Sequence, residues 1–148
     1  MLVSRTSKLA IIALADLAAR GADEWTSADK LYQSFVEGLA FLRHIMNRLA
    51  REGIVRSKKG RRGGFQIAAP AGKLSLGQVV IAIEGSDSSR RCLLNSETCD
   101  GTVLCSLAPK WHPIRKMLFD FLNSETIQTA AERGIGRIDP FDIGVLDE

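Results

Sequence analysis

The first half of the chain repeats apolar residues with the period of an α-helix. Residues 5–20 follow this spacing up to a glycine, which predicts a first helix. The T-x-x-D pattern at Thr26 resembles a helix capping box and predicts a short second helix ending near residue 35. A third helix is predicted between Gly38 and Gly53, with an apolar stripe made of Leu42, Ile45, Met46 and Leu49.

After Gly53 the helical period gives way to a pattern that favours a hairpin. Residues 54–59 (IVRSKK) and 65–69 (FQIAA) are strand candidates, and GRRGG lies between them. Gly63 and Gly64 tolerate the positive φ angles that a tight hairpin turn requires. The order of helix, short helix, turn, helix and hairpin is that of a winged helix-turn-helix.

The second half of the chain holds further helical patterns around a polar segment. Ser75 is expected to cap a helix that reaches Glu84. A longer helix is predicted at 109–123, followed by a short one capped by Ser124. The expected fold is mainly α with a small β wing and a long C-terminal dimerisation helix. Its predicted parts are a winged helix-turn-helix unit at 1–85, a cysteine loop at 86–106, two helices at 107–133 and an irregular tail at 134–148.

Charge is unevenly divided between the two halves of the chain. Residues 1–85 carry 13 Lys and Arg against 7 Asp and Glu, whereas residues 86–148 carry 7 against 10. From Gly53 to Ile83 there is no acidic residue at all. A basic half joined to an acidic half predicts an anionic partner for the first half of the chain.

Double-stranded DNA fits this pattern best. In a winged helix-turn-helix the second helix of the pair enters the major groove, while the wing follows the backbone or the minor groove. Arginine can bind guanine with two hydrogen bonds and asparagine can bind adenine in the same way, while basic hairpin residues meet phosphates. A solvated basic face and an RNA-binding surface are the weaker alternatives, and the chain lacks an aromatic-rich sheet for stacking RNA bases. The candidate DNA-binding residues are Arg43, His44, Asn47, Arg48, Arg51, Lys58, Lys59, Arg61, Arg62, Gly63 and Gly64.

All three cysteines lie in one polar stretch, CLLNSETCDGTVLC, at positions 92, 99 and 105. Thiolates on such a loop can hold an iron–sulfur cluster, whereas zinc sites prefer narrower spacings. Three cysteines are one ligand short of either usual set. A cluster-free thiol switch that forms a disulfide or a sulfenic acid is the alternative. Arg90 and Arg91 directly precede Cys92 and are expected to favour its thiolate form.

Several segments together resemble one family of bacterial regulators. They are SKLAI in the first helix, FLRHIMNRLAREGIVRSKKGRRGGFQIA, LSLGQVVIAIEG, the three cysteines that follow, and a tryptophan six residues beyond the last of them. From residue 1 to about residue 132 the chain is similar to the IscR/NsrR/RirA family of winged helix-turn-helix transcriptional regulators. The resemblance implies a double-stranded DNA operator and a homodimer joined by the helix at 109–123. Residues expected in the dimer contact are Trp111, Phe119, Phe121 and Leu122.

The resemblance also implies a cofactor. Many family members hold a [2Fe–2S] or [4Fe–4S] cluster with three cysteines and one further ligand, and loss, oxidation or nitrosylation of the cluster changes DNA affinity. The three family cysteines match Cys92, Cys99 and Cys105 in order. Where relatives place the fourth ligand this chain has Ala108 or Lys8. The remaining candidates are His112, Asp100 and Glu97, and the alternatives are water, a small thiol or a group from the partner subunit. Arg43 stands where some relatives have an acidic residue, so the operator sequence does not carry over from those relatives, whereas the mode of DNA binding does.

The sequence therefore predicts a cytoplasmic transcriptional regulator that senses redox, nitric oxide or iron status. No apolar run approaches the roughly 18 residues of a transmembrane helix, so no membrane partner is expected. Asp16 interrupts the apolar N-terminal stretch that a signal peptide would need. An enzyme is not expected, since no Ser-His-Asp arrangement is recognisable around His44 or His112. An enzyme or metal carrier whose basic half binds some other anion is the least favoured hypothesis.

Overall fold

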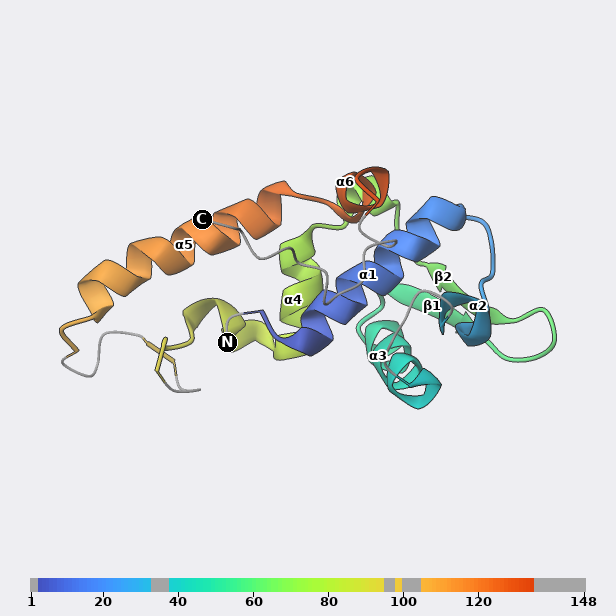
Figure 1. The fold of residues 1–148 in the computed structure, drawn as a ribbon, viewed down its shortest axis with the longest axis horizontal. Helices are drawn as coiled ribbons and strands as arrows, with labels where there is room; N and C mark the ends of the chain where they lie inside the picture. The colour runs from blue at the N-terminus through green and yellow to red at the C-terminus, as the bar shows by residue number, and fades with distance from the viewer. Residues whose placement is uncertain (1–2, 33–37, 95–97, 100–104, 135–148) are drawn as a thin grey trace, which may run out of the picture.

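The computed structural model describes residues 3–32, 38–94, 98–99 and 105–134 of the 148-residue chain. Its helices are α1 (Arg5–Arg20), α2 (Ala28–Tyr32), α3 (Leu39–Arg51), α4 (Leu76–Glu84), α5 (Ala108–Ser124) and α6 (Ile127–Glu132), with short 3₁₀ helices η1 (Ala71–Lys73) and η2 (Ser86–Arg90). Strands β1 (Val55–Lys58) and β2 (Gly64–Ile67) pair antiparallel. The expected mainly α fold with a small β hairpin is therefore confirmed. Figure 1 shows α5 extending to one end of the molecule and the hairpin to the other.

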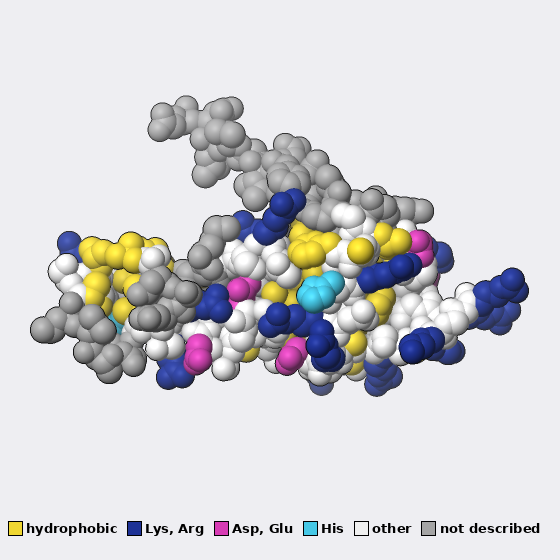
Figure 2. Space-filling view, turned by 90° about the horizontal axis from the view of Figure 1, so that it is seen from below, with side chains coloured by type: hydrophobic (Ala, Val, Ile, Leu, Met, Phe, Trp, Pro, Cys, Tyr) yellow, Lys and Arg dark blue, Asp and Glu magenta, His cyan; other side chains and the backbone are white. Residues whose placement is uncertain are grey.

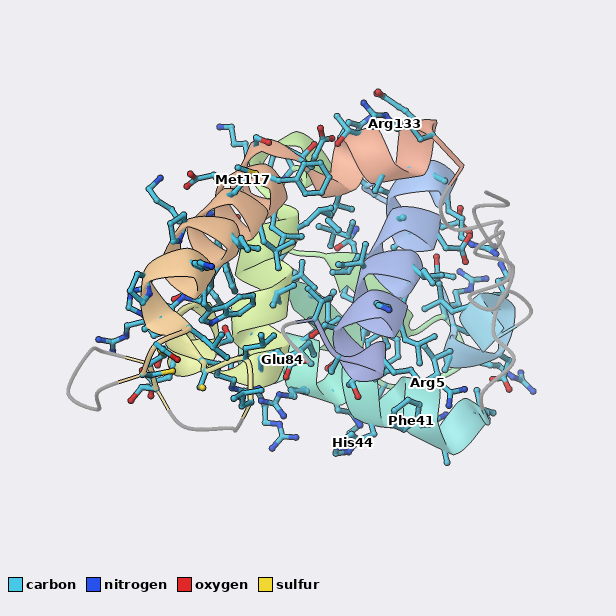
Figure 3. The ribbon with its side chains drawn as sticks, turned by 60° about the vertical axis from the view of Figure 1, so that its left-hand side comes forward. Arg5, Phe41, His44, Glu84, Met117 and Arg133 are labelled. Atoms are coloured by element: carbon cyan, nitrogen blue, oxygen red, sulfur yellow. The ribbon has the colours of Figure 1, made fainter. Side chains whose placement is uncertain are left out.

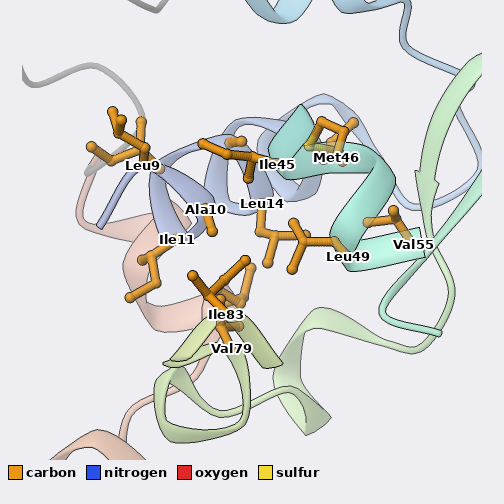
Figure 4. Close-up of a cluster of buried hydrophobic side chains, with 14 of the residues drawn as sticks. Leu9, Ala10, Ile11, Leu14, Ile45, Met46, Leu49, Val55, Val79 and Ile83 are labelled. Atoms are coloured by element: carbon orange, nitrogen blue, oxygen red, sulfur yellow. The ribbon is translucent and has the colours of Figure 1, made fainter. Parts of the chain in front are cut away.

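Helix α1 forms the centre of the core because apolar residues occupy most of its length. Ser4 caps its N-terminus by accepting a hydrogen bond of 3.1 Å from the Ser7 amide. The helix packs against α2, α3, α4, α6 and β2. Figure 4 shows Leu9 and Leu14 of α1 among buried side chains of α3 and α4. Since burial of one such leucine contributes about 2 kcal/mol, this helix holds the surrounding elements together.

The hairpin, which we call the wing (residues 55–67), is fastened to the segment in front of α2. Thr26 and Phe65 exchange backbone hydrogen bonds of 3.0 and 2.8 Å, which add one bridge to the two-stranded sheet. Gly64 lies at this point with a φ of 139°, and a Cβ atom there would be 2.2 Å from the Thr26 carbonyl oxygen. Both the backbone angle and the close approach require glycine.

Some boundaries differ from the sequence prediction. The strands are shorter than expected, because pairing runs from Val55–Ile67 to Lys58–Gly64. Thr126, not Ser124, caps α6 by accepting the Thr129 amide at 3.2 Å, whereas the Ser124 hydroxyl donates to the Phe121 carbonyl at the end of α5. Two predictions lie outside the described residues. They are the end of the second helix near residue 35 and the irregular tail, of which only residue 134 is described. Within the described residues no helix has the length and apolarity to cross a membrane.

Helices α4 and α5 touch closely where Gly77 faces Asn123. A Cβ atom on Gly77 would lie 2.0 Å from the Asn123 Oδ1 atom. Ser75 caps α4, as expected, within a capping box completed by Gln78. The η2 turn packs against both α4 and α5, and α6 returns to pack against α1. The four-part division of the chain stays a prediction. Two of its predicted parts are in direct contact, because α1 packs against α6.

Candidate functional site

Helix α3 presents a polar face opposite the face that it buries. Its buried face is made, as the apolar stripe predicted, of Leu42, Ile45, Met46 and Leu49. The exposed residues include four of the candidate DNA-binding residues, Arg43, His44, Asn47 and Arg51. Figure 3 shows His44 and Phe41 on the outer side of α3, and Figure 2 shows a histidine on this face among Lys and Arg side chains.

Two arginines of α3 have partners within the fold. The Arg43 Nη2 atom lies 3.7 Å from the Asp29 Oδ2 atom of α2, and both side chains are exposed. Arg48 is half-buried, and its Nε–H donates to the Ala82 carbonyl of α4 at 3.2 Å. Arg48 therefore fastens α3 to α4, which the helical pattern did not predict.

The wing carries the second group of candidate DNA-binding residues. The exposed members are Lys58, Lys59, Arg61 and Arg62, while Gly63 and Gly64 are half-buried. Figure 2 shows a projecting cluster of basic side chains at the end of the molecule where Figure 1 places the hairpin. The Lys58 Nζ atom lies 5.8 Å from the centre of the Trp25 ring, so a cation–π contact joins the last residue of β1 to the segment in front of α2.

The three cysteines line one small hollow at the start of α5. The other lining residues are Leu93, Leu94, Leu107, Ala108 and Trp111. Each cysteine is half-buried. The Leu94 amide donates to the Cys92 Sγ atom at 3.4 Å, and the Cys99 Sγ atom lies 3.2 Å from the His112 Nε2 atom. Of the candidates for a fourth ligand, Glu97 and Asp100 lie outside the described residues, and His112 contacts a cysteine.

The donor atoms around this cysteine hollow suit an iron–sulfur cluster in their chemistry. Three thiols and an imidazole are soft or borderline ligands, and the walls of the hollow are apolar. Across the described residues, however, no three His, Cys, Asp or Glu side chains are grouped closely enough to hold a metal ion. Holding a cluster therefore requires the three thiols to approach one another more closely than they do here.

Arg91 joins the cysteine loop to the two helices beside it. Its carbonyl accepts hydrogen bonds from the Trp111 Nε1 atom at 3.2 Å and from Arg115 at 3.1 Å, both on α5. Its guanidinium pairs with the Glu84 carboxylate at 3.3 Å. Arg90 likewise pairs with Asp87 at 3.0 Å. Both guanidinium groups thus bind carboxylates, and the expected effect of these two arginines on the Cys92 thiolate stays a prediction.

Glu84 is a functional candidate that the sequence reasoning missed. Its side chain is only 10% exposed and accepts hydrogen bonds from the hydroxyls of Ser4 and Ser7. Burial raises the pKa of Glu84, but these hydrogen bonds and the charge of Arg91 together lower it below its ordinary value. The carboxylate is therefore held in its charged form at the junction of α1, α4 and the cysteine loop.

Helix α5 divides its apolar residues between two faces. Trp111, Phe119 and Leu122, which were expected in a dimer contact, are buried within the fold of this chain. Ile114, Met117 and Phe121 remain exposed by 58%, 72% and 54%. Their spacing places them along one side of the helix, so the described fold leaves an apolar stripe on α5 uncovered.

Known proteins share both sequence and fold with this chain. The HTH-type transcriptional regulator IscR of Photobacterium profundum is 25% identical over 127 residues, which cover 86% of this chain and 73% of that protein. Among solved structures, CymR (YrzC), the global cysteine regulator of B. subtilis, matches with a TM-score of 0.72 at 20% identity, covering 88% of this chain and 96% of that one. T. potens IscR matches with a TM-score of 0.71 at 20% identity, covering 89% and 87%.

The family model that matches the chain spans nearly all of its described part. Residues 3–133 match Rrf2, described as an iron-dependent transcriptional regulator. This range contains α1 to α6, the wing and the three cysteines. The chain belongs to the Rrf2 family of transcriptional regulators.

Proposed function

We propose that the chain is a homodimeric regulator that binds a double-stranded DNA operator and senses redox, nitric oxide or iron status through its cysteine loop. The observation that carries this proposal is the cysteine hollow, in which all three thiols gather beside Trp111 at the start of α5. Partly exposed thiols are open to oxidation, so their shared position supports a sensing role. Reduced thiols are typical of the cytoplasm, where the protein is proposed to act.

DNA binding is assigned to α3 and the wing. The exposed face of α3 offers an arginine that can bind guanine and an asparagine that can bind adenine in the major groove, namely Arg43 and Asn47. His44 and Arg51 lie on the same face. The basic residues of the wing would contact phosphates or the minor groove. Such contacts add affinity with little sequence preference.

A second copy of the chain is the proposed partner of α5. Ile114, Met117 and Phe121 would bury their exposed apolar area against the same stripe of the partner, as in a two-fold interface. A dimer places two α3 helices on successive half-sites about 34 Å apart. Small changes in the position of α5 would therefore alter how well both helices fit DNA at once.

In this proposal Cys92, Cys99 and Cys105 supply three thiolates to a [2Fe–2S] or [4Fe–4S] cluster, and His112 supplies the fourth ligand. The bound cluster contributes redox-active iron. The Leu94 amide stabilises negative charge on the Cys92 sulfur through its hydrogen bond. The leucines and Trp111 around the hollow limit the access of water. The loop with a bound cluster and the loop without one would differ in how firmly they hold α5. Binding or loss of the cluster would therefore shift the population of α5 positions, and the DNA affinity would change with it.

The second candidate function is a cluster-free thiol switch on the same DNA-binding fold. The gathering of three half-buried thiols around one hollow favours it, because two thiols can form a disulfide without a metal. Two thiols would give up two electrons and two protons to hydrogen peroxide, which becomes two molecules of water as the disulfide forms.

Iron, sulfide and zinc analysis with a visible absorption spectrum distinguishes these functions. The protein is purified without oxygen, and Cys92→Ala, Cys99→Ala and Cys105→Ala are compared with the matched surface variant His44→Ala. A cluster predicts visible bands with matched iron and sulfide, lost in each cysteine variant and kept in His44→Ala. Unchanged spectra in all three cysteine variants contradict the cluster. A colourless, iron-free protein with fully reduced thiols supports the thiol switch.

A further inference from the structure

The carboxylate of Glu84 binds two different parts of the molecule with its two oxygens. Its Oε1 atom accepts the hydroxyls of Ser4 and Ser7, which stand at the start of α1, the Ser7 bond being 2.5 Å long. Its Oε2 atom pairs with the Arg91 Nη1 atom at 3.3 Å, and the Arg91 Nη2 atom donates to the Glu84 carbonyl at 2.8 Å. Figure 3 shows Glu84 at the end of α4 beside the first turn of α1.

Arg91 in turn depends on the arrangement of the cysteine loop. The Cys99 amide donates at 2.7 Å to the carbonyl of Arg90, the residue directly before Arg91. The Arg91 carbonyl itself is held by Trp111, which lines the cysteine hollow. A rearrangement that draws the cysteines together or drives them apart therefore acts on the backbone that carries the Arg91 guanidinium.

The last turn of α4 also reaches the proposed DNA-binding helix. Ala82, two residues before Glu84, accepts the Arg48 hydrogen bond of 3.2 Å from α3. The same turn thus fixes the start of α1 through Glu84 and the C-terminal half of α3 through Ala82. A displacement of this turn would change the position of both helices.

We propose that Glu84 is a positioning residue that couples the cysteine loop to the first turn of α1 and, through the last turn of α4, to α3. The inference deepens the proposed function, on which its regulatory meaning rests, by naming the side chain that carries the response. A buried carboxylate that loses a cationic partner must find other hydrogen bonds or move toward water. A rearrangement of the loop that withdraws Arg91 from Glu84 therefore changes how Glu84 binds Ser4 and Ser7.

Hydrogen exchange of the protein without DNA tests this coupling directly. We would measure exchange at the Ser7 and Lys8 amides, whose hydrogen bonds to Ser4 form the first turn of α1. Exchange is compared before and after alkylation of the cysteines with iodoacetamide. The mass of the product confirms the alkylation. Amides of the middle of α1 serve as the internal reference for global unfolding. Wild-type exchange at the first turn is expected to rise by about fivefold or more, the lower range of site-to-site coupling in proteins.

The variants separate coupling from simple stability. In Glu84→Gln alkylation is expected to add little to the first-turn exchange, because the ion pair that carries the response is already absent. Ser7→Ala removes one of the two hydroxyls that bind Glu84 and keeps the Ser4 cap; it is expected to weaken the response to alkylation and serves if Glu84→Gln does not fold. The matched control is Asp87→Asn, which removes the exposed pair with Arg90 in the same loop and is expected to respond as the wild type does.

Two results would overturn the inference. One is a wild-type first turn whose exchange does not change on alkylation, and the other is a Glu84→Gln protein that responds as strongly as the wild type. Failure of the proposed function is distinguished by a separate measurement. If the exchange responds as expected but the protein does not bind DNA, the coupling stands and the regulatory proposal fails.

Discussion

The tip of the wing offers a quantitative test of DNA binding. Lys59, Arg61 and Arg62 are exposed, and none of them forms a salt bridge within the part of the chain that the structure describes. In a dimer, changing all three to Gln removes as many as six phosphate contacts. Each contact contributes about 0.9 to the slope of log K against log salt concentration, so the slope should become shallower by about 5. Between 50 and 200 mM salt, the loss of affinity should therefore be about a thousandfold smaller in the variant than in the wild type.

Fluorescence anisotropy provides the assay, with a labelled duplex selected from random-sequence DNA by the wild-type protein. The salt series is repeated with Lys116→Gln, an exposed lysine on α5 that pairs with Asp120 and lies away from the wing, and this control should keep the wild-type slope. The melting temperature of the triple variant should also be unchanged, since exposed side chains contribute little to stability. A triple variant with the wild-type slope would refute the assignment of the wing to phosphate contacts.

Other residues give independent predictions. Gly64→Ala should lower the free energy of unfolding by about 1–3 kcal/mol in urea denaturation, because its Cβ atom would lie 2.2 Å from the Thr26 carbonyl oxygen in a backbone conformation with a φ of 139°; unchanged stability would contradict the close contact of β2 with the segment in front of α2. Because the pKa of Glu84 is lowered in the folded protein, its contribution to stability is present above its ordinary value of about 4.5 and is lost as pH falls through the folded-state pKa. Glu84→Gln should therefore flatten the acid side of the stability curve measured by thermal denaturation, and an equally steep curve would oppose this reasoning. Met117→Glu should convert the proposed dimer to a monomer in sedimentation velocity, whereas Lys110→Glu on the same helix should not; a dimeric Met117→Glu protein would show that the exposed stripe on α5 is not the interface.

Local patterns in the sequence predicted the elements that depend on local physics. The apolar stripe of α3 and the capping of α4 by Ser75 follow from helical periodicity and from side-chain hydrogen bonds within a few residues. Gly63 and Gly64 were expected to supply the positive φ angles of the hairpin turn. In the structure Gly64, at the start of β2, and Gly60 have a positive φ and Gly63 does not. The contact with Thr26 is a second reason for glycine at position 64. The family resemblance stated from the motifs is confirmed by the match to the family model.

Contacts between residues that are far apart in the chain leave no local pattern in the sequence. Glu84 meets Ser7 across 77 positions, and Arg48 reaches Ala82 across 34, so no periodicity could reveal either bond. Apolar character alone does not say which surface covers a residue, which is why Trp111 and Phe119 were expected in a dimer contact although the chain buries them itself. For the cysteine loop, spacing predicted the chemistry of the donors, and the structure supplied the shared hollow and the neighbour of Cys99, His112.

The central claim is that the state of the cysteine loop controls DNA affinity. The most direct measurement is the dissociation constant for the selected duplex, determined without oxygen before and after exposure of the protein to hydrogen peroxide, with iron content and free thiols counted in the same samples. We expect the dissociation constant of the wild type to change by about fivefold or more, the usual lower range of allosteric coupling, and that of the variant with alanine at Cys92, Cys99 and Cys105 to stay the same. A wild-type affinity that stays constant while its thiols or iron are lost would contradict the claim.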